Sequence, residues 1–574
     1  MNSDFLKTMR VVLSLFLLSL LTFEPLAVHA GRKDTSKKVL TEDQRVKQIL
    51  SRLTFGARPA DFEKVKKIGI KAYIEEQLNP DTIDDSALDK RLEKLPTLGL
   101  STPSIAEQYN PPKPKPTPSP APTVLPEMVK PTPTPTETPK PVASPAPKPT
   151  PAPKNPQMVV NELQRAKLLR AVYSERQLNE MLVDFWENHF SIYANKDADR
   201  WLMTAFDRDA VRPFSMGRFR DLLGATAHSP AMLFYLDNWQ SSVVRTYPAT
   251  KDKPERKTGG INENYARELM ELHTLGVDGG YTQKDVQEVA RCFTGWTIRK
   301  PNEEGLFLFN PQMHDNGEKK VLGQKIAAGG GLGDAEKVLD ILAKSPSTAK
   351  FIATKLAQRF LGDDPSAAVI NQAAQVFLKT DGSIRETLRS IITSPPFLSP
   401  AAYQTKIKSP FEFVAAALRI TDAETDANNP VLSRIAKMGQ SLFGHVTPDG
   451  YPEKSSEWLS TGSLLERLNF ASALARNQIK GTTINTKELL QGADLNNPSV
   501  VSTDLVKFVL LGEISPNSKA EFDKIVQSAA LSENKTVDSE QKTAMTKKEA
   551  NIKPPDYVTE LLTLALGSPE FQRR

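Results

Sequence analysis

Histidine is rare in this sequence, and most of its histidines fall within one stretch of the chain. Four of the six, His189, His228, His273 and His314, lie between residues 189 and 314 of a chain of 574 residues. Imidazole transfers protons near neutral pH and is also a common metal ligand. These residues are therefore the first candidates for catalysis or metal binding.

Two of these histidines are predicted to point inward from helices. In a helix predicted over residues 263–275, a rotation of 100° per residue puts His273 on the same apolar arc as Leu269. On the helix before it, His189 falls on the apolar side with Phe185. An unpaired polar group inside a protein costs about 1–3 kcal/mol, so each imidazole needs a partner.

The carboxylates near these histidines leave three hypotheses open. In the first, each imidazole is structural and bonds to a backbone carbonyl. In the second, His189, His273 and Glu268 bind a divalent metal ion, although the spacing matches no known zinc motif such as HExxH. In the third, His273 or His314 works with Glu268 or Glu271 as an acid–base pair. Glu271 also belongs to an i, i+4 series of charged residues that would serve equally well as surface ion pairs.

Several other chemistries are excluded by the absence of their motifs. The sequence has no GxSxG elbow, no Walker A loop, no EF-hand loop, and no GxGxxG between a strand and a helix. Cys292 is the only cysteine, so neither an intrachain disulfide nor a CxxC zinc site can form.

The net positive charge of the chain comes mostly from a proline-rich stretch. The chain carries 74 basic and 68 acidic residues, a net charge of +6. Residues 111–156 contain six lysines and two glutamates, which gives +4 and leaves the rest nearly neutral. That balance argues against nucleic-acid binding by a folded face. We predict a linker over 109–157 that adopts extended polyproline II conformations.

The first thirty residues resemble a secretory signal peptide. Lys7 and Arg10 precede an apolar run from Val11 to Phe23, and small side chains favour cleavage after Ala30. An apolar run of about a dozen residues is too short to cross roughly 30 Å of hydrocarbon. We therefore predict no stable membrane span after cleavage, and a periplasmic or extracellular protein.

The remaining sequence predicts a mainly α-helical fold. Helical periodicity covers residues 31–108 and most of 158–574, which we interpret as two parts of one large multi-helical body interrupted by the linker. Three short runs rich in aromatic and β-branched residues, separated by turn signals, predict a small inserted β-meander at about 293–326. His314 lies at a strand end of this meander, beside the turn that begins at Asp315.

Several segments resemble a known family. The sixteen residues from Asn262 to Val277 read NENYARELMELHTLGV, and Thr294-Gly295-Trp296 and His314-Asp315 follow them. With the string from Phe185 to Phe190, they resemble the bacterial DUF1800 family from about residue 43 to the C-terminus. The resemblance implies export, a mostly helical fold and a partner from an exported sulfatase-like family, DUF1501. It implies no established reaction. At Ser345 relatives usually have a histidine, which weakens the metal hypothesis.

Two functions are consistent with these features. The first is a hydrolytic or metal-dependent enzyme outside the cytoplasm, with its site around His189, His273, Glu268, Glu271 and His314. The alternative is a non-catalytic envelope scaffold or binding protein that works with the exported partner. The sequence predicts neither the substrate nor the oligomeric state.

Overall fold

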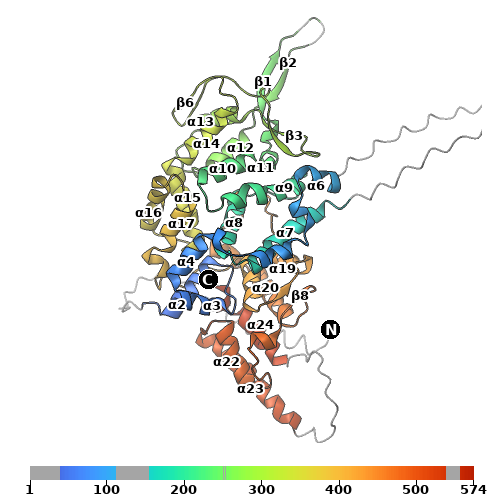
Figure 1. The fold of residues 1–574 in the computed structure, drawn as a ribbon, viewed down its shortest axis with the longest axis vertical. Helices are drawn as coiled ribbons and strands as arrows, with labels where there is room; N and C mark the ends of the chain where they lie inside the picture. The colour runs from blue at the N-terminus through green and yellow to red at the C-terminus, as the bar shows by residue number, and fades with distance from the viewer. Residues whose placement is uncertain (1–38, 111–153, 250, 252–253, 538–555) are drawn as a thin grey trace, which may run out of the picture. The chain divides into compact units, whose positions relative to one another are not determined.

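The computed structural model describes residues 39–110, 154–249, 251, 254–537 and 556–574. Residues 41–574 group into one unit (Figure 1). The predicted signal peptide over 1–30 lies outside the described residues, and so do residues 111–153 of the predicted linker.

Helices dominate the described residues, which confirms the predicted mainly α-helical fold. Among the described residues, five α-helices precede the linker: α2 (Glu42–Leu53), α3 (Asp61–Ile68), α4 (Ile70–Leu78), α5 (Ser86–Leu92) and α6 (Thr102–Tyr109). Those that follow it up to residue 293 are α7 (Gln157–Tyr173), α8 (Gln177–His189), α9 (Asp199–Ala205), α10 (Phe219–His228), α11 (Pro230–Tyr235), α12 (Glu263–Glu271) and α13 (Gln283–Phe293).

The second half of the described chain is also built from helices, most of them between 9 and 15 residues long. They are α14 (Gly333–Ala343), α15 (Pro346–Phe360), α16 (Ala367–Lys379), α17 (Ile384–Ile392), α18 (Pro410–Ile420), α19 (Asn429–Lys437), α20 (Thr461–Ala475), α21 (Thr486–Leu489), α22 (Pro498–Phe508), α23 (Pro516–Val537), α24 (Asp556–Gly567) and α25 (Pro569–Gln572).

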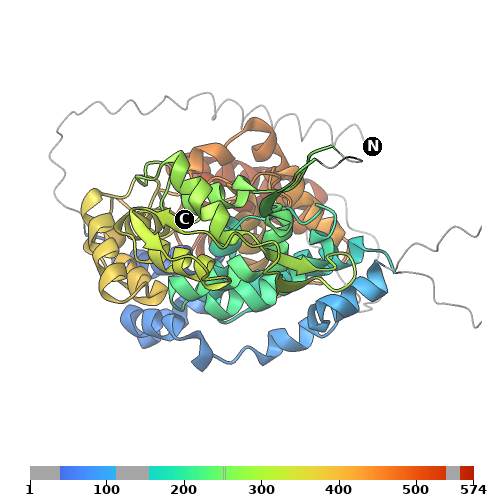
Figure 2. The ribbon, with the colours of Figure 1, turned by 90° about the horizontal axis from the view of Figure 1, so that it is seen from above.

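Helices from both sides of the linker share one apolar core. The backbone N–H of Phe55 donates to the Gln177 side chain at 3.0 Å, and the N–H of Leu178 donates to the Gln77 side chain at 3.1 Å. These bonds tie the start of α8 to the helices that precede the linker. Seen from above in Figure 2, the segment from α2 to α6 runs along one side of the unit.

Local capping sets the helix starts around the predicted site. Asn262 caps α12 by accepting the N–H of Asn264 at 2.8 Å, and Thr282 opens α13 with a capping box. The helix predicted to reach residue 275 ends earlier, at Glu271, and the chain turns through wider bonds, such as that from the N–H of His273 to the Glu268 oxygen at 3.0 Å. The imidazole of His273 nevertheless stays buried, as predicted.

The described strands form four separate antiparallel pairs. They are β1 (Ser242–Tyr247) with β2 (Arg256–Gly260), β3 (Trp296–Arg299) with β4 (Leu306–Phe309), β5 (Lys319–Val321) with β6 (Gln324–Ile326), and β7 (Glu424–Thr425) with β8 (Thr482–Thr483).

The predicted three-stranded meander over 293–326 is instead two separate hairpins, β3–β4 and β5–β6. The third predicted run folds back on itself because Leu322 and Gly323 both adopt positive φ angles, 46° and 80°. Two successive positive φ values make the tight two-residue turn that favours a hairpin. The run therefore supplies both of its own strands and does not pair with β4.

Within the described residues, no helix combines the length and the apolar character needed to span a membrane.

Candidate functional site

The structure brings two of the predicted histidines together. His189, at the end of α8, donates from Nε2 to the backbone oxygen of His273 at 3.0 Å. The two ring centroids lie 6.1 Å apart, and both side chains are buried. Because Nε2 carries the proton, Nδ1 of His189 keeps its lone pair, and it has no hydrogen-bond partner among the described residues. Nε2 of His273 likewise has none.

Lys355 of α15 completes a histidine–lysine cluster with His189 and His273. Burial, together with the positive charge of Lys355, lowers the pKa of His273 to about 3. Burial and Lys355 also lower the pKa of His189 well below its ordinary value. Burial lowers the pKa of Lys355 itself despite the attraction of Glu453 and Asp449. Both imidazoles are therefore neutral at physiological pH.

The two predicted carboxylates lie on α12, apart from this cluster. Glu271 accepts a hydrogen bond from the Tyr281 hydroxyl at 3.2 Å. Burial and the neighbouring Glu271 raise the pKa of half-buried Glu268. In the part of the chain that the structure describes, no three His, Cys, Asp or Glu side chains converge to hold a metal ion. The predicted ligand set of His189, His273 and Glu268 is thus not assembled.

His314 belongs to a different buried cluster. Its Nδ1 donates to the backbone oxygen of Thr294 at 2.7 Å, and its Nε2 lies 3.2 Å from Oδ2 of Asp334. Lys319 donates to the same Asp334 oxygen at 2.6 Å. The side chains of His314, Lys319 and Asp334 are fully buried, so this cluster fastens β5 to the start of α14. His314 contacts neither His189 nor His273 through these bonds.

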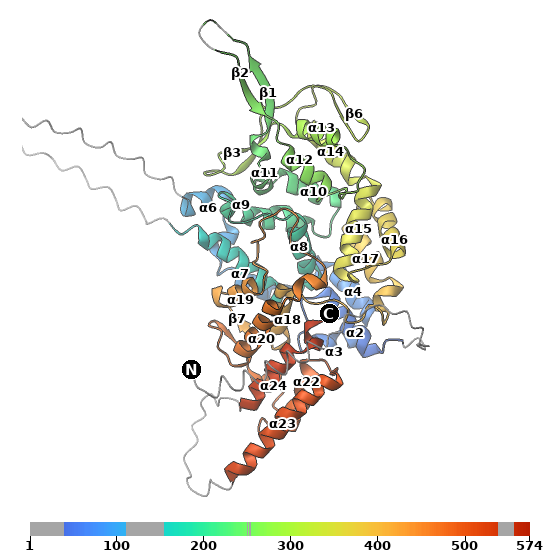
Figure 3. The same cartoon turned by 180° about the vertical axis from the view of Figure 1, so that it is seen from behind.

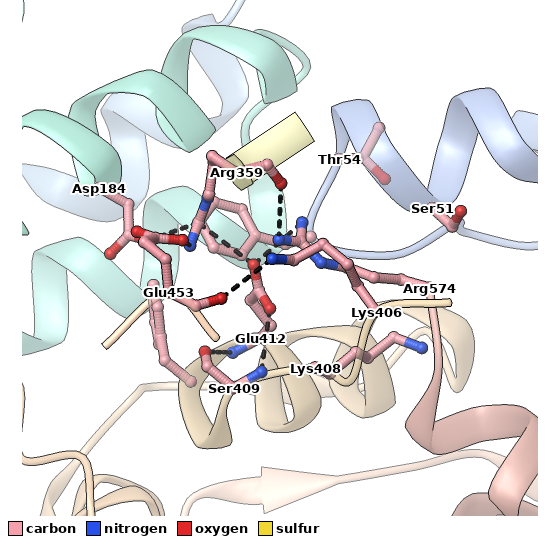
Figure 4. A network of polar contacts seen from close by, with 12 residues as sticks. Ser51, Thr54, Asp184, Arg359, Lys406, Lys408, Ser409, Glu412, Glu453 and Arg574 are labelled. Carbon is pink, nitrogen blue, oxygen red and sulfur yellow. Dashed lines mark hydrogen bonds and ion pairs between the residues drawn. The ribbon is translucent and has the colours of Figure 1, made fainter. Parts of the chain in front are cut away.

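A cavity with about 690 Å³ of empty space, part of it open to solvent, lies beside α8. We call it the charged cleft. Its walls come from α7, α8, α15, α18 and the segment 440–458 (Figure 4). The ionisable residues that line it are Lys167, Asp184, Glu187, Arg359, Lys406, Glu412, His445, Glu453 and Arg574.

Asp184 is the ionised carboxylate of the α8 wall. Its two oxygens accept Lys167 Nζ at 2.7 Å and Arg359 Nη2 at 2.7 Å. Burial would raise the pKa of Asp184, but the two cations outweigh burial and lower it. Arg359 also contacts Glu412 at 3.2 Å, so the cations of this wall are held in a connected network (Figure 4).

Glu187 lies one helical turn after Asp184 on α8, and its pKa is shifted in the opposite direction. Its Oε2 accepts Lys167 Nζ at 2.6 Å, and its carboxyl group also hydrogen-bonds to the Asp207 carboxylate. Burial raises the pKa of Glu187 against the attraction of Lys167, and the nearby Asp207 carboxylate raises it further. Burial acts on Asp207 too, but Arg212 and Arg170 outweigh it and lower the pKa of Asp207. Glu187 therefore holds the proton of this carboxyl pair.

His445 lines the cleft on the segment that faces α8. Its Nε2 lies 3.1 Å from Oδ1 of Asp449 and 2.9 Å from the Thr447 hydroxyl, which itself donates to Asp449. The proton of His445 is therefore on Nε2, and Nδ1 keeps its lone pair. Burial alone would raise the pKa of Asp449, but the bonds from Thr447 and His445 lower it.

Sequence reasoning found the inward histidines but missed the charged cleft. Glu187 could have been identified from the sequence, because it lies in the family-like string from Phe185 to Phe190, two residues before His189. Lys355 and His445 carry no local signal of this kind. The imidazoles that Lys355 affects, His189 and His273, lie more than 80 residues from it in the sequence, and Glu187, which lines the same cleft as His445, lies more than 250 residues from His445.

Residues 48–573 match the model of a protein family described as "Protein of unknown function (DUF1800)". No curated protein matches the chain, and no solved structure does.

Proposed function

We propose that this chain, which belongs to the DUF1800 family, is a hydrolase that uses acid–base catalysis in the charged cleft. One observation carries the proposal: a carboxyl that retains its proton, Glu187, and an imidazole with a free nitrogen, His445, line the same cavity. Acid–base catalysis requires a proton donor and a proton acceptor in one site.

The reaction that this arrangement would support is the addition of water across a polar bond. His445 Nδ1 takes a proton from water as the water oxygen attacks the substrate, and Asp449 stabilises the resulting imidazolium. Glu187 gives its proton to the departing oxygen or nitrogen. Arg359 lines the same cavity, so its guanidinium supplies positive charge near the negative charge that develops in the transition state.

The predicted set of His273, Glu268, Glu271 and His314 is not the basis of this proposal. His314 lies in a different cluster from the other three, and none of the four lines the charged cleft. The histidine–lysine cluster lies behind the α8 wall, since Asn188 faces the cleft and His189 points inward. We assign that cluster a positioning role for α8.

We also propose that the reaction takes place outside the cytoplasm. The support is the N-terminal sequence, whose basic start, apolar run and small residues before Gly31 are typical of a cleaved signal. Mass spectrometry of the protein from producing cells would show a first residue of Gly31. An intact N-terminus in protein recovered from the cytoplasm would contradict export.

The catalytic proposal is tested by screening the purified protein against esters, amides, glycosides and sulfate esters. Glu187→Gln and His445→Ala should each lower the best activity by about 100-fold or more, the usual contribution of a positioned acid or base. The matched controls are Glu162→Gln, a buried glutamate bonded to Thr97, and His228→Ala, both outside the cleft.

The controls should retain most of the activity. If no substrate class responds, or if the cleft variants and controls lose activity equally, the hydrolase proposal is wrong. Circular dichroism would confirm that each variant keeps the helical fold.

A further inference from the structure

The β1–β2 hairpin stands away from the helices near it (Figures 1 and 3). Its base is fixed by the bond from the N–H of Val243 to the oxygen of Met313 at 2.8 Å. Beyond Val243, neither strand makes a backbone hydrogen bond outside the hairpin to any described residue. From Val244 to Tyr247 every residue is exposed, so the ribbon has two solvent-facing sides and free edges.

This hairpin carries unbalanced positive charge. Its described residues include four exposed cations, Arg245, Lys251, Arg256 and Lys257, and one exposed carboxylate, Glu255. Arg245 donates to a backbone oxygen, and Arg256 lies over the Tyr247 ring at 5.5 Å. Among the described residues, none of the four cations has a carboxylate partner. Elsewhere on the unit, exposed arginines such as Arg218 and Arg299 are paired with carboxylates.

Apolar surface and open backbone accompany the charge. Val244 is 49% exposed and Tyr247 is 47% exposed, so the ribbon offers apolar surface beside its cations. At the root of the hairpin, an open hollow is lined by Gln240, Gly259, Gly260, Ile261, Asn262 and Glu263. A Cβ added to Gly260 would meet no atom within 4 Å, so backbone is accessible there.

We propose that the β1–β2 hairpin and the hollow at its root bind an extended acidic polypeptide segment of a partner protein. Free strand edges recognise peptide backbone by adding a strand, and alternating side chains then provide specificity. The cations favour carboxylates on the incoming segment and speed its association. A polypeptide fits these features better than other polyanions, because only a peptide can satisfy the backbone groups of the free edges.

Direct binding tests this inference without any knowledge of the partner. The probe is a fluorescent ten-residue peptide in which glutamate alternates with valine, and the readout is anisotropy with the full-length protein at low salt. Binding should weaken at least tenfold in the variant Arg245→Glu/Lys257→Glu and should also weaken as salt rises. The matched control is Lys519→Glu/Lys524→Glu on α23, where both lysines are exposed.

Two further probes separate the proposed ligand from other anions. A peptide of the same charge with proline at every second position cannot pair along a strand edge and should bind at least tenfold more weakly. Vesicles with anionic lipid should bind no better than neutral vesicles. Absence of peptide binding, equal losses in the hairpin and control variants, or equal binding of the proline peptide would each overturn the inference. None of these outcomes bears on catalysis in the cleft.

Discussion

The proton on Glu187 can be tested through stability, without knowledge of the substrate. Glu187 and Asp184 share Lys167, at 2.6 and 2.7 Å, but only Asp184 is expected to be ionised at neutral pH. Glutamine replaces a protonated glutamic acid with a neutral group of the same shape that still accepts from Lys167. Glu187→Gln should therefore not lower the free energy of unfolding by more than about 1 kcal/mol, the net value of one hydrogen bond.

Asp184→Asn should have a much larger effect. The change removes the negative charge that lies 2.7 Å from both Lys167 and Arg359. The side chains of Asp184 and Lys167 are each 12% exposed, and that of Arg359 is 6% exposed, so solvent does little to replace the lost partner. Breaking a buried pair from one side typically costs about 3–5 kcal/mol. Asp184→Asn should thus be less stable than Glu187→Gln by about 2 kcal/mol or more.

Urea unfolding at pH 6.5, followed by circular dichroism, measures both values. Asp340→Asn is the control for a half-exposed pair, because Asp340 is 53% exposed and contacts Arg220 at 2.6 Å; it should cost about 1 kcal/mol or less. If Glu187→Gln is as costly as Asp184→Asn, Glu187 is ionised in the folded protein and cannot be the proton donor.

The pH dependence of stability gives a second test of whether Glu187 is protonated. A folded-state pKa above the ordinary value of 4.5 means that the folded chain keeps a proton that the unfolded chain has lost. The stability of the wild type relative to Glu187→Gln should therefore be greatest below pH 4.5 and decline as pH rises toward the raised pKa. A relative stability that rises with pH over that interval would contradict the assignment.

Three further changes test the surrounding structure by urea unfolding. Burial lowers the pKa of Lys408 to about 7, so the unfolded chain holds the extra proton above that pH. The stability of the wild type relative to Lys408→Met should therefore increase from pH 7 to 10, by at most about 1.4 kcal/mol per pH unit. A stability difference that stays constant over this range would contradict the prediction. Lys319→Met leaves the fully buried Asp334 without its cation and should cost about 3–5 kcal/mol; a cost below 1 kcal/mol would show that the cluster is not ionic. Gly56→Ala should cost more than about 1 kcal/mol, because a Cβ at φ 126° would lie 2.8 Å from Ala416 Cα; an unchanged midpoint would refute that.

The elements that local patterns control were predictable from the sequence. The caps at Asn262 and Thr282 depend on side chains two or three residues from the N–H groups that they accept. The inward directions of His189 and His273 follow from the helical repeat, which also relies on near neighbours only. Local patterns did not predict how the third strand run pairs. Positive φ angles at Leu322 and Gly323 favour the β5–β6 hairpin over the predicted three-stranded meander.

The sequence by itself determined a mainly helical chain, the family to which it belongs, and two imidazoles that must find partners inside. Only the tertiary structure decided which groups those partners are. His189 meets His273 and Lys355, and His445 and Glu187 line one cleft built from segments between residues 167 and 574. Proton affinities depend on burial and on charges brought close by folding, and neither quantity is encoded in the spacing of residues along the chain.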